Sequence, residues 1–461
     1  LCVYILRRLF RRKKDMLFSS QIFIFAFLPI FMIIYYIAGK KYRNAVLFIG
    51  SIIFYSIGEL KYLPLMIGML TVNYFAAELI EDSKSTIKKK IILFIILFVD
   101  FGILIYYKGF AKHIPLGISF YTFQITAYVI DVYKTDAKAQ HNYVNLGTYL
   151  CMFPQLIAGP IILYTDIDKE IEKREYNFEN IEEGLKIFVI GLASKVLVAD
   201  VLAMLVNEIK VTGYDSITTI MAWIGAIAYS IEIYFDFNGY SLMAIGLGRM
   251  LGFHIPRNFD NPYISRSVSE FWRRWHITLG RWFRDYVYIP LGGNRNGRFN
   301  TIRNLLIVWI LTGIWHGCGV TFVLWGISTF VIIALEKVFL HKILDKSKII
   351  SSIYMFLFIN VSWVIFSLED LASVKTYLLR MCPVIKGSAS AYINSLDYVS
   401  ALKRYGLFLI IGIIFSTPIG EKLYKKYGKT YILAGILLVV FWLCVYRMAT
   451  SAANPFLYFR F

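Results

Sequence analysis

Residues 271–299 read FWRRWHITLGRWFRDYVYIPLGGNRNGRF, and residues 304–317 read NLLIVWILTGIWHG. At about 100° per residue, a helix built from the first segment carries a mostly aromatic arc opposite a set of arginines. The arc contains Phe271, Trp272, Trp275, Leu279, Trp282, Phe283 and Tyr286, and the opposite side contains Arg273, Arg274, Arg281 and Arg284. This pattern predicts an amphipathic helix in the membrane interface over residues 267–290, with a capping box at Ser267 and Glu270.

Each of the two histidines in this region directly follows a tryptophan. His276 lies at the border of the aromatic arc, so its imidazole can point inward. His316 ends an apolar run, where an ionisable side chain is costly and often serves a function. Thr312 and Gly313 are small and lie on the same helix face, which leaves room beside the His316 ring. A structural hydrogen bond between helices is the alternative role for this histidine.

The composition predicts a membrane protein that crosses the bilayer many times. Hydrophobic residues make up 58% of the 461 residues, and aromatic residues make up 17%. The net charge of +19 comes from basic residues that flank apolar runs, which favours anionic lipid headgroups and an anionic donor over nucleic acid. The five cysteines are scattered, so neither a disulfide framework nor a metal site is indicated, and no cleavable signal peptide is evident.

Apolar runs long enough to cross a bilayer recur along the whole chain, and a span needs about 20 residues. They lie near residues 17–38, 43–58, 62–80, 90–107, 185–206, 217–236, 304–316, 320–340, 350–368, 405–417 and 430–448. Segments 114–131 and 145–163 are shorter or broken. We therefore predict an all-α, polytopic fold with about 11 to 13 transmembrane helices and several interfacial or re-entrant helices.

The second broken segment contains Pro154, Gln155, Gly159 and Pro160. Non-helical backbone at membrane depth is tolerated where it is buried in protein or lines a cavity. The segment is interpreted as a cavity wall, and a simple helix kink is the alternative.

The bias of lysine and arginine in short loops sets the predicted orientation. It places Met16 and the C-terminus outside the cell membrane. Residues 1–15 form a basic stretch on the wrong side for this topology, so they are interpreted as an extension that precedes the native start, and a basic arm on the membrane surface is the alternative. Residues 16–461 are predicted to form a single membrane domain, and residues 454–461 an extracytoplasmic aromatic motif.

Two further polar groups are candidates for function. Asp236 and Asn238 end an apolar run in YFDFNGYS, and Asp236 is predicted to form a structural ion pair with Arg249 or with an arginine of residues 273–284, rather than to act as a catalytic acid. The loop formed by Gly292, Gly293, Asn294 and Arg295 could offer backbone N–H groups and cations to a phosphate. No P-loop, nucleophile elbow, HExxH zinc motif or dinucleotide fingerprint occurs, which removes support for hydrolase, nucleotidase and dehydrogenase functions.

Six motifs together resemble the membrane-bound O-acyltransferases, in particular the branch that acetylates alginate. They are MLFSSQIFIFAFLPI, PLGISFYTFQ, FPQLIAGPI, YFDFNGYS, RNFDNPYISRSVSEFWRRWHITLGRWFRDYVYIPLGGNR and LTGIWHG. The resemblance extends from Met16 to Phe461. One position departs from the pattern, because Leu242 stands where the family usually has an aspartate.

The resemblance implies a central funnel or tunnel in which a histidine catalyses acyl transfer. His316 would be the catalytic histidine, and His276 a second functional histidine near the acyl tunnel. The acyl group, usually acetyl, would pass from a cytoplasmic thioester to a hydroxyl outside, and no bound cofactor or metal would be needed. A neutral imidazole can deprotonate a hydroxyl as it attacks a thioester carbonyl.

The resemblance also implies a donor site and a relay. The donor, acetyl-CoA or another acyl thioester, would meet the basic side of the 271–298 region and the tunnel wall. These positions are Trp275, Trp315, Arg273, Arg274, Arg284, Asp285, Gly292, Gly293, Asn294 and Arg295. The aromatic C-terminus is similar to an FxYFxF ending of this branch, so Tyr458 is a hypothetical acyl carrier. It would hand the group to a secreted acyltransferase of the same pathway or directly to a polysaccharide.

Three other functions are weighed against acetylation. D-alanyl transfer to teichoic acid is the alternative within the acyltransferases. A glycan transporter or flippase would also need many spans, but internal repeats between two halves are not seen. A scaffold that recruits a soluble acyltransferase is the third. In every case the predicted location is the plasma or inner membrane.

Overall fold

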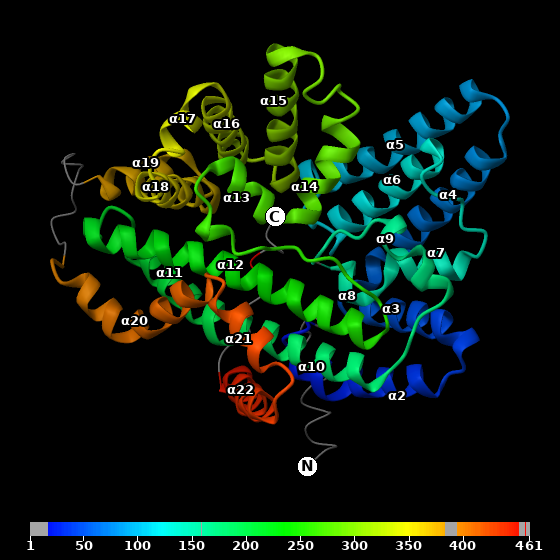
Figure 1. Ribbon diagram of the computed structural model, residues 1–461, viewed down its shortest axis with the longest axis horizontal. Coiled ribbons are helices and arrows are strands. Elements are labelled where there is room, and N and C mark those ends of the chain that lie inside the picture. The colour runs from blue at the N-terminus through cyan, green and yellow to red at the C-terminus, as the bar shows by residue number, and fades with distance from the viewer. Residues whose placement is uncertain (1–16, 158, 383–393, 451–456, 458–461) are drawn as a thin grey trace. The chain divides into compact units, whose positions relative to one another are not determined.

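The computed structural model describes residues 17–157, 159–382, 394–450 and 457. Within these ranges every regular element is a helix, and no strand is formed (Figure 1). Eight helical stretches of the described chain are long and apolar enough to cross a membrane. The predicted all-α, multi-pass fold class is therefore confirmed.

The predicted apolar runs all lie in helices, although the eight stretches are fewer than the spans expected. Lys40–Asp82 contains two predicted runs, which a short 3₁₀ turn joins at Leu60–Tyr62. The run at 304–316 belongs to α15 (Gly297–His316), whose first half is polar and basic. Phe23–Ile37 is apolar but shorter. The difference follows from how the stretches are defined, because the two helices of Lys40–Asp82 form one continuous stretch and the apolar part of α15 is shorter than the helix.

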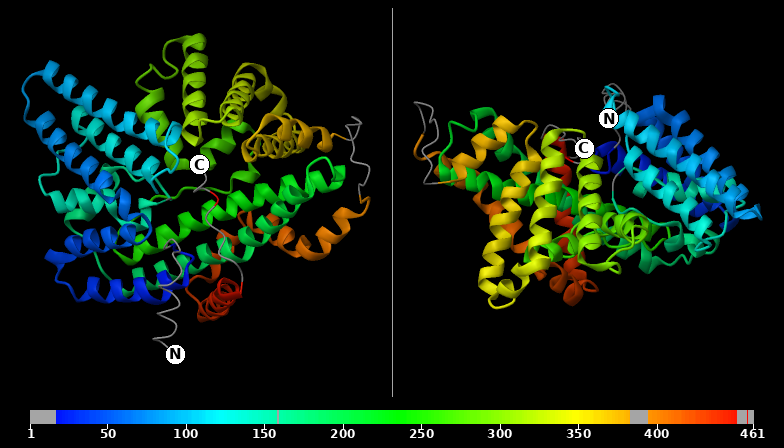
Figure 2. Two further views of the ribbon diagram at one scale, coloured as in Figure 1. Left: turned by 180° about the vertical axis from the view of Figure 1, so that it is seen from behind. Right: turned by 90° about the horizontal axis from the view of Figure 1, so that it is seen from above.

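The described chain divides into two compact units. The first comprises Leu1–Leu192, Tyr240–Pro256 and Phe441–Ala453, and the second comprises Ala193–Gly239, Arg257–Val440 and Asn454–Phe461. Two further views show the same helices from behind and from above (Figure 2). The boundary falls inside two long helices, α12 (Thr219–Met250) and α22 (Tyr431–Thr450).

The first unit is built on helices that the chain contributes before residue 194. They are η1 (Phe23–Phe27), α2 (Leu28–Ile37), η2 (Lys40–Tyr42), α3 (Arg43–Glu59), η3 (Leu60–Tyr62), α4 (Leu63–Asp82), α5 (Thr86–Gly109), α6 (Ile118–Lys134), α7 (Tyr143–Cys151), α8 (Phe153–Leu156), α9 (Tyr164–Glu172) and α10 (Phe178–Ala193). Helix α6 is buried over almost its whole length because α4, α5, α7 and α9 pack around it. Helix α5 keeps most of its apolar surface exposed, as expected of a lipid-facing helix.

The predicted interruption near residue 154 is confirmed. Pro154 lies in the first turn of the four-residue helix α8, and the described residues 157 and 159–163 that follow have no regular structure. Gly159 has a φ of +125°, which favours glycine, and Pro160 follows it. Gln155 is fully buried and donates from Nε2 to the carbonyl of Tyr149. The backbone here is therefore buried in protein, and its role as a cavity wall stays a prediction.

The second unit contains the region with both tryptophan–histidine pairs. Its elements are η4 (Ser194–Ala199), α11 (Asp200–Thr212), the first part of α12, η5 (Pro262–Ile264), α13 (Val268–Arg274), α14 (Ile277–Phe283), η6 (Arg284–Tyr288), α15, α16 (Val320–Leu335), η7 (Glu336–Leu340), α17 (His341–Leu344), α18 (Lys348–Ser367), α19 (Leu371–Met381), α20 (Asp397–Phe415), α21 (Ile419–Tyr427) and the first part of α22. Helices α15 and α16 lie side by side (Figure 1).

Glycines allow the close approach of α15 and α16. A Cβ atom on Gly313 would lie 2.7 Å from the carbonyl oxygen of Phe322, and one on Gly326 would lie 2.5 Å from that of Trp309. Small residues at such crossings let helix backbones touch in membranes. Gly313 therefore serves the packing of α15 against α16, while Thr312 and His316 both line a cavity.

The single amphipathic helix predicted over residues 267–290 is also wrong. Helix α13 ends at Arg274, Trp275 is extended, and His276 adopts a left-handed conformation with a φ of +45° before α14 begins. The aromatic side chains are still mostly buried and the arginines more exposed, as the pattern indicated. Periodicity identified the buried face correctly, but hydrogen bonds from a distant segment break the helix at the histidine.

Candidate functional site

A chamber of about 240 Å³ lies within the second unit, and both histidines line it. Its wall comes from α13, the following turn, α14, η6 and α15. The lining residues are Trp272, Trp275, His276, Leu279, Gly280, Phe283, Arg284, Tyr288, Leu305, Val308, Trp309, Thr312 and His316. The wall is mainly apolar, and its polar side-chain groups are two imidazoles, the hydroxyls of Tyr288 and Thr312, the guanidinium of Arg284 and the indole N–H groups of the tryptophans. A few polar groups in an apolar cavity are typical of a small-molecule site.

His316 is the last residue of α15, and aromatic rings surround its imidazole. Its ring centroid lies 4.7 Å from that of Trp315, 5.2 Å from that of Trp325 and 5.0 Å from that of Phe366. All three neighbours meet the imidazole at steep angles, between 74° and 90°. The side chain is nearly buried yet reaches the chamber. The aromatic box thus restricts the orientation of the imidazole beside a space that can hold a ligand.

His276 is held by Asn258, a residue that the sequence analysis missed. The Nδ1 atom of His276 lies 3.0 Å from the Oδ1 atom of Asn258, and the Thr278 hydroxyl donates to the same oxygen over 2.9 Å. The backbone N–H of Ile277 donates to the Asn258 carbonyl over 2.9 Å. The left-handed backbone at His276 therefore belongs to a turn that Asn258 stabilises. The sequence offers one signal for this residue. Asn258 lies in RNFD, ahead of the basic aromatic segment, and an asparagine buried there would need hydrogen-bond partners.

These contacts also define the chemical state of His276. Because Asn258 Oδ1 accepts from its neighbours, Nδ1 of the imidazole carries the hydrogen, and Nε2 is the basic nitrogen. Burial lowers the pKa of His276 to about 3. His276 is therefore neutral at physiological pH.

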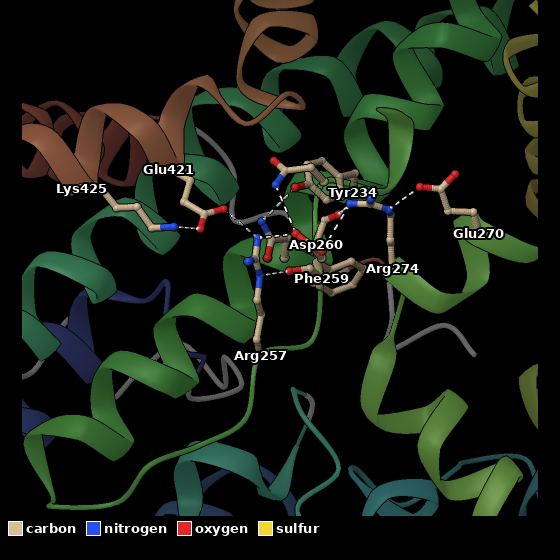
Figure 3. A network of polar contacts seen from close by, with 10 residues as sticks. Tyr234, Arg257, Phe259, Asp260, Glu270, Arg274, Glu421 and Lys425 are labelled. Carbon is tan, nitrogen blue, oxygen red and sulfur yellow. Dashed lines mark hydrogen bonds and ion pairs between the residues drawn. The ribbon is translucent and has the colours of Figure 1, made fainter. Parts of the chain in front are cut away.

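A chain of alternating charges holds the segment that contains Asn258 (Figure 3). Arg257 lies 3.1 Å from both Asp260 and Glu421 of α21, and Lys425 lies 2.8 Å from Glu421. Arg274, at the end of α13, lies 3.3 Å from a carboxylate oxygen of Asp260 and donates over 3.1 Å to its carbonyl. The backbone N–H of Asp260 donates to the carbonyl of Arg274 over 2.9 Å. The 257–260 segment is thereby fixed against the turn that carries His276.

The structure separates the predicted donor-binding residues into two groups. Trp275 and Arg284 line the chamber, and Trp315 packs between the two imidazoles, with ring centroids 6.2 Å from His276 and 4.7 Å from His316. The others do not line it. Arg273 is exposed, Arg274 binds Glu270 and Asp260, and Asp285 pairs with Arg284 over 2.7 Å.

The glycine loop lies next to the chamber without lining it. Gly292 and Gly293 have φ angles of +100° and +57°, which favour glycine. The buried side chain of Asn304 donates to the carbonyls of Leu291 and Gly293 over 3.1 and 2.9 Å, which fixes the loop. The side chains at positions 294, 295, 298 and 303 are exposed. The loop can present cations to a ligand outside the chamber, but its phosphate-binding role stays a prediction.

Asp236 forms the buried ion pair that the sequence suggested, but with a different partner. Its Oδ1 atom lies 2.7 Å from Nζ of Lys195, which also lies 2.6 Å from Asp200. The predicted partner Arg249 instead pairs with Glu183 over 2.6 Å. The sequence could not identify Lys195, because it lies 41 residues away on another helix. The side-chain amide of Asn238 makes a long contact of 3.4 Å with the hydroxyl of Tyr234.

The C-terminal motif is described at one position. The backbone N–H of Leu457 donates to Oδ2 of Asp236 over 2.8 Å. Tyr458, the hypothetical acyl carrier, lies outside the described residues. Among the residues that are described, no group of three or more histidine, cysteine, aspartate or glutamate side chains could hold a metal ion.

We expect an Asn258→Asp substitution to make the acyl transfer that the sequence resemblance implies slower at acid pH. A carboxylate beside the imidazole favours the charged form and raises the pKa of His276 from its lowered value. Activity of the variant should then fall as the pH decreases, while the His276 of the unmodified protein stays neutral from about pH 5 to 8. Initial rates across this range provide the measurement.

Thr278→Val is the matched control for this substitution, because it removes a hydrogen bond to the same Asn258 oxygen without adding charge. Its pH profile should follow that of the unmodified protein. If the Asn258→Asp variant is active but its rate at low pH falls no more than that of the unmodified protein, the prediction that His276 takes part in the reaction as a neutral imidazole is contradicted.

Comparison with known proteins shows the family of this chain. The sequence matches the membrane-bound O-acyltransferase family over residues 57–368, which include both histidines. It is 34% identical to the probable alginate O-acetylase AlgI of Pseudomonas putida, with 97% of this chain and 100% of that protein aligned. It is 31% identical to the peptidoglycan O-acetyltransferase of Helicobacter pylori, with 97% and 98% aligned. It is 28% identical to the teichoic acid D-alanyltransferase of Streptococcus thermophilus, with 49% and 58% aligned. The chain belongs to the membrane-bound O-acyltransferase family and is an O-acyltransferase.

Proposed function

We propose that this protein transfers an acetyl group from a cytoplasmic thioester, across the membrane, for O-acetylation of an exopolysaccharide or cell-wall glycan. The observation that carries the proposal is the shared chamber, since His276 and His316 line one mainly apolar space. The names of two relatives, an alginate O-acetylase and a peptidoglycan O-acetyltransferase, support an acetyl group and a glycan acceptor.

In the proposed reaction His316 acts as the general base. Its neutral imidazole takes the proton from an acceptor hydroxyl as the hydroxyl oxygen attacks the thioester carbonyl. The carbon–sulfur bond then breaks, and the thiolate leaves with the proton that the imidazole carries. His276, which is neutral and fixed by Asn258, lines the same chamber and orients the acyl group. The apolar lining excludes water, which would otherwise hydrolyse the thioester.

Positive charge beside the chamber supports an anionic donor such as acetyl-CoA. Arg284 lines the chamber, and Arg295, Arg298 and Arg303 lie exposed on and after the adjoining glycine loop. Arginine is suited to bidentate contact with phosphate. We propose that these side chains bind the phosphates of coenzyme A while the thioester enters the apolar space.

Tyr458 remains the proposed acyl relay on the outer side. Its neighbour Leu457 binds Asp236, and the next residue of α12, Phe237, contacts the His276 ring with centroids 4.7 Å apart. We expect Tyr458→Phe to remove most acetyl ester from the polysaccharide, because the carrier hydroxyl is lost. Tyr446→Phe, a change at an exposed tyrosine of α22, is the control and should leave the ester content unchanged. Full acetylation in Tyr458→Phe cells would rule out the relay.

Mass analysis of envelope polysaccharides tests the function itself. Cells that lack the protein should lose acetyl esters and regain them when it is restored, while polymer export continues. Loss of D-alanyl esters instead would favour teichoic acid D-alanylation, which the partial match to a D-alanyltransferase brings into consideration. Loss of polymer export would favour a transporter.

A separate experiment tests whether the protein only recruits a soluble acyltransferase. Labelling of the purified protein by radiolabelled acetyl-CoA would exclude such a scaffold.

The proposed location is the plasma or inner membrane, with the C-terminus on the extracytoplasmic side. A secreted acyltransferase of the same pathway is the proposed partner. This orientation rests on the lysine and arginine bias of the loops.

A further inference from the structure

A buried carboxylate outside the chamber gathers four hydrogen bonds. Glu336 begins the π-helical turn η7 after α16, and its side chain is 4% exposed. It accepts from the backbone N–H groups of Val268 and Ser269 over 2.5 and 2.9 Å, and from the Ser269 hydroxyl over 2.7 Å. The hydroxyl of Tyr354 on α18 donates to it over 3.0 Å. So many donors on one carboxylate fix its position firmly.

Two of these donors are the first backbone N–H groups of α13. The first four N–H groups of a helix have no partner within the helix. In α13, Glu336 accepts from Val268 and Ser269, and the Ser267 hydroxyl accepts from Glu270 over 3.0 Å, while the bond from Phe271 to the Ser267 carbonyl over 2.9 Å is the first within the helix. The negative charge also complements the positive end of the helix dipole. The N–H groups of Val268, Ser269 and Glu270 are therefore all bonded, and two of these three bonds come from Glu336, which lies far along the chain.

The anchored helix carries part of the chamber wall. Helix α13 has seven residues, and a helix of that length depends on its surroundings for stability. Trp272 lies on it, and Trp275 and His276 follow directly after it, so all three lining residues move with its position. Its far end is bound to Asp260 through Arg274. Glu336 is the corresponding anchor at the N-terminal end of α13, whereas the turn that Asn258 stabilises follows the C-terminal end of this helix.

We infer that Glu336 is a positioning residue for the acyl transfer reaction. By holding the first turn of α13, it determines where Trp272 and His276 stand in the chamber, although it is not among the described residues that line the chamber. This inference rests on the proposed function, because it assigns the reaction to that chamber. A displacement of reacting groups by about 1 Å can lower a rate about 10²-fold.

Glu336→Gln is the test, because glutamine has nearly the same shape but turns an N–H₂ group toward N–H donors. The measurement is the initial rate at which the purified protein releases coenzyme A from acetyl-CoA in the presence of extracted envelope polysaccharide. We expect kcat to fall about 10- to 10²-fold with little change in the KM for acetyl-CoA. Rates are compared well below the unfolding temperature of each variant. If Glu336→Gln does not fold, Glu336→Asp, which keeps the charge on a shorter side chain, is measured by the same criteria.

The chain offers a matched control in Asp397. This carboxylate on α20 accepts from the backbone N–H and the hydroxyl of Thr218 over 2.9 and 2.7 Å, just before α12 begins. Helix α12 contributes none of the described lining residues, so Asp397→Asn should lower the unfolding temperature but leave kcat unchanged. An unchanged kcat in the Glu336 variant, or equal losses of kcat in both variants, would overturn the inference. His316→Ala, measured in parallel, separates a failure of this inference from a failure of the proposed function. If the His316→Ala protein keeps its activity, the proposed function is overturned whatever the Glu336 variant does.

Discussion

Replacing His316 with alanine is expected to lower acyl transfer about 10²- to 10⁴-fold, the usual contribution of a general base. The imidazole stands at the chamber wall inside a box formed by Trp315, Trp325 and Phe366. No other described residue of this box carries a group that can take a proton from a hydroxyl near neutral pH. The effect should appear in kcat, with binding of acetyl-CoA largely preserved. Coenzyme A release by the purified variant provides the measurement.

The control for this prediction is His254→Ala. His254 is an exposed histidine that pairs with Glu170, and it contributes nothing to the chamber. Its substitution should leave the rate unchanged. His316→Gln keeps a polar side chain of similar size but cannot act as a base, so it should be as inactive as the alanine variant. A His316→Gln protein that is folded and fully active would show that the imidazole has no catalytic role.

Replacing Lys195 with methionine is expected to destabilise the protein by about 3 to 5 kcal/mol. Lys195 and Asp236 are each 2% exposed, and their charges lie 2.7 Å apart. Removing the cation leaves the carboxylate of Asp236 buried without its counter-charge, and this desolvation is the source of the cost. The unfolding midpoint of the purified protein in detergent measures the change.

Two companion variants separate this charge effect from a general loss of packing. Lys195→Met combined with Asp236→Leu removes both buried charges and should recover most of the stability, because an apolar pair avoids the desolvation cost. Lys210→Met breaks an exposed pair with Glu369 at 3.8 Å and should change the midpoint little. A single Lys195→Met variant as stable as Lys210→Met would contradict the buried pair. The double variant also removes the Asp236 carboxylate that accepts from the Leu457 N–H. Its rate of acyl transfer therefore shows whether this hydrogen bond to the C-terminal segment matters for activity.

Local patterns in the sequence were sufficient to predict where most of the long helices lie, and the motifs were sufficient to predict the protein family. Every apolar run long enough to span a bilayer lies in a helix, because backbone groups in lipid must bond within their own segment. The buried face of the 271–286 region also followed its sequence, since aromatic residues avoid water whichever helix carries them. The two tryptophan–histidine pairs were recognised as chemically unusual, and the structure brings both histidines to one chamber.

The failures share one cause, which is contact between residues far apart in the chain. Periodicity predicted one helix through His276, but hydrogen bonds from Asn258 favour a left-handed turn there. The partner of Asp236 is Lys195, which no local pattern identifies. Glu336 reads as an ordinary charged residue at a helix end until it is seen to hold the start of α13.

The sequence by itself determined that this is a helical membrane protein of the O-acyltransferase family, because hydrophobic periodicity and motif order are written along the chain. The tertiary structure alone decided which atoms face one another. It brought the two imidazoles to one chamber, set the tautomer of His276 through Asn258, and matched the buried carboxylates of Asp236 and Glu336 to their partners. The physical reason is that a buried polar group needs a partner within hydrogen-bonding distance, and the fold rather than the neighbouring sequence supplies that partner.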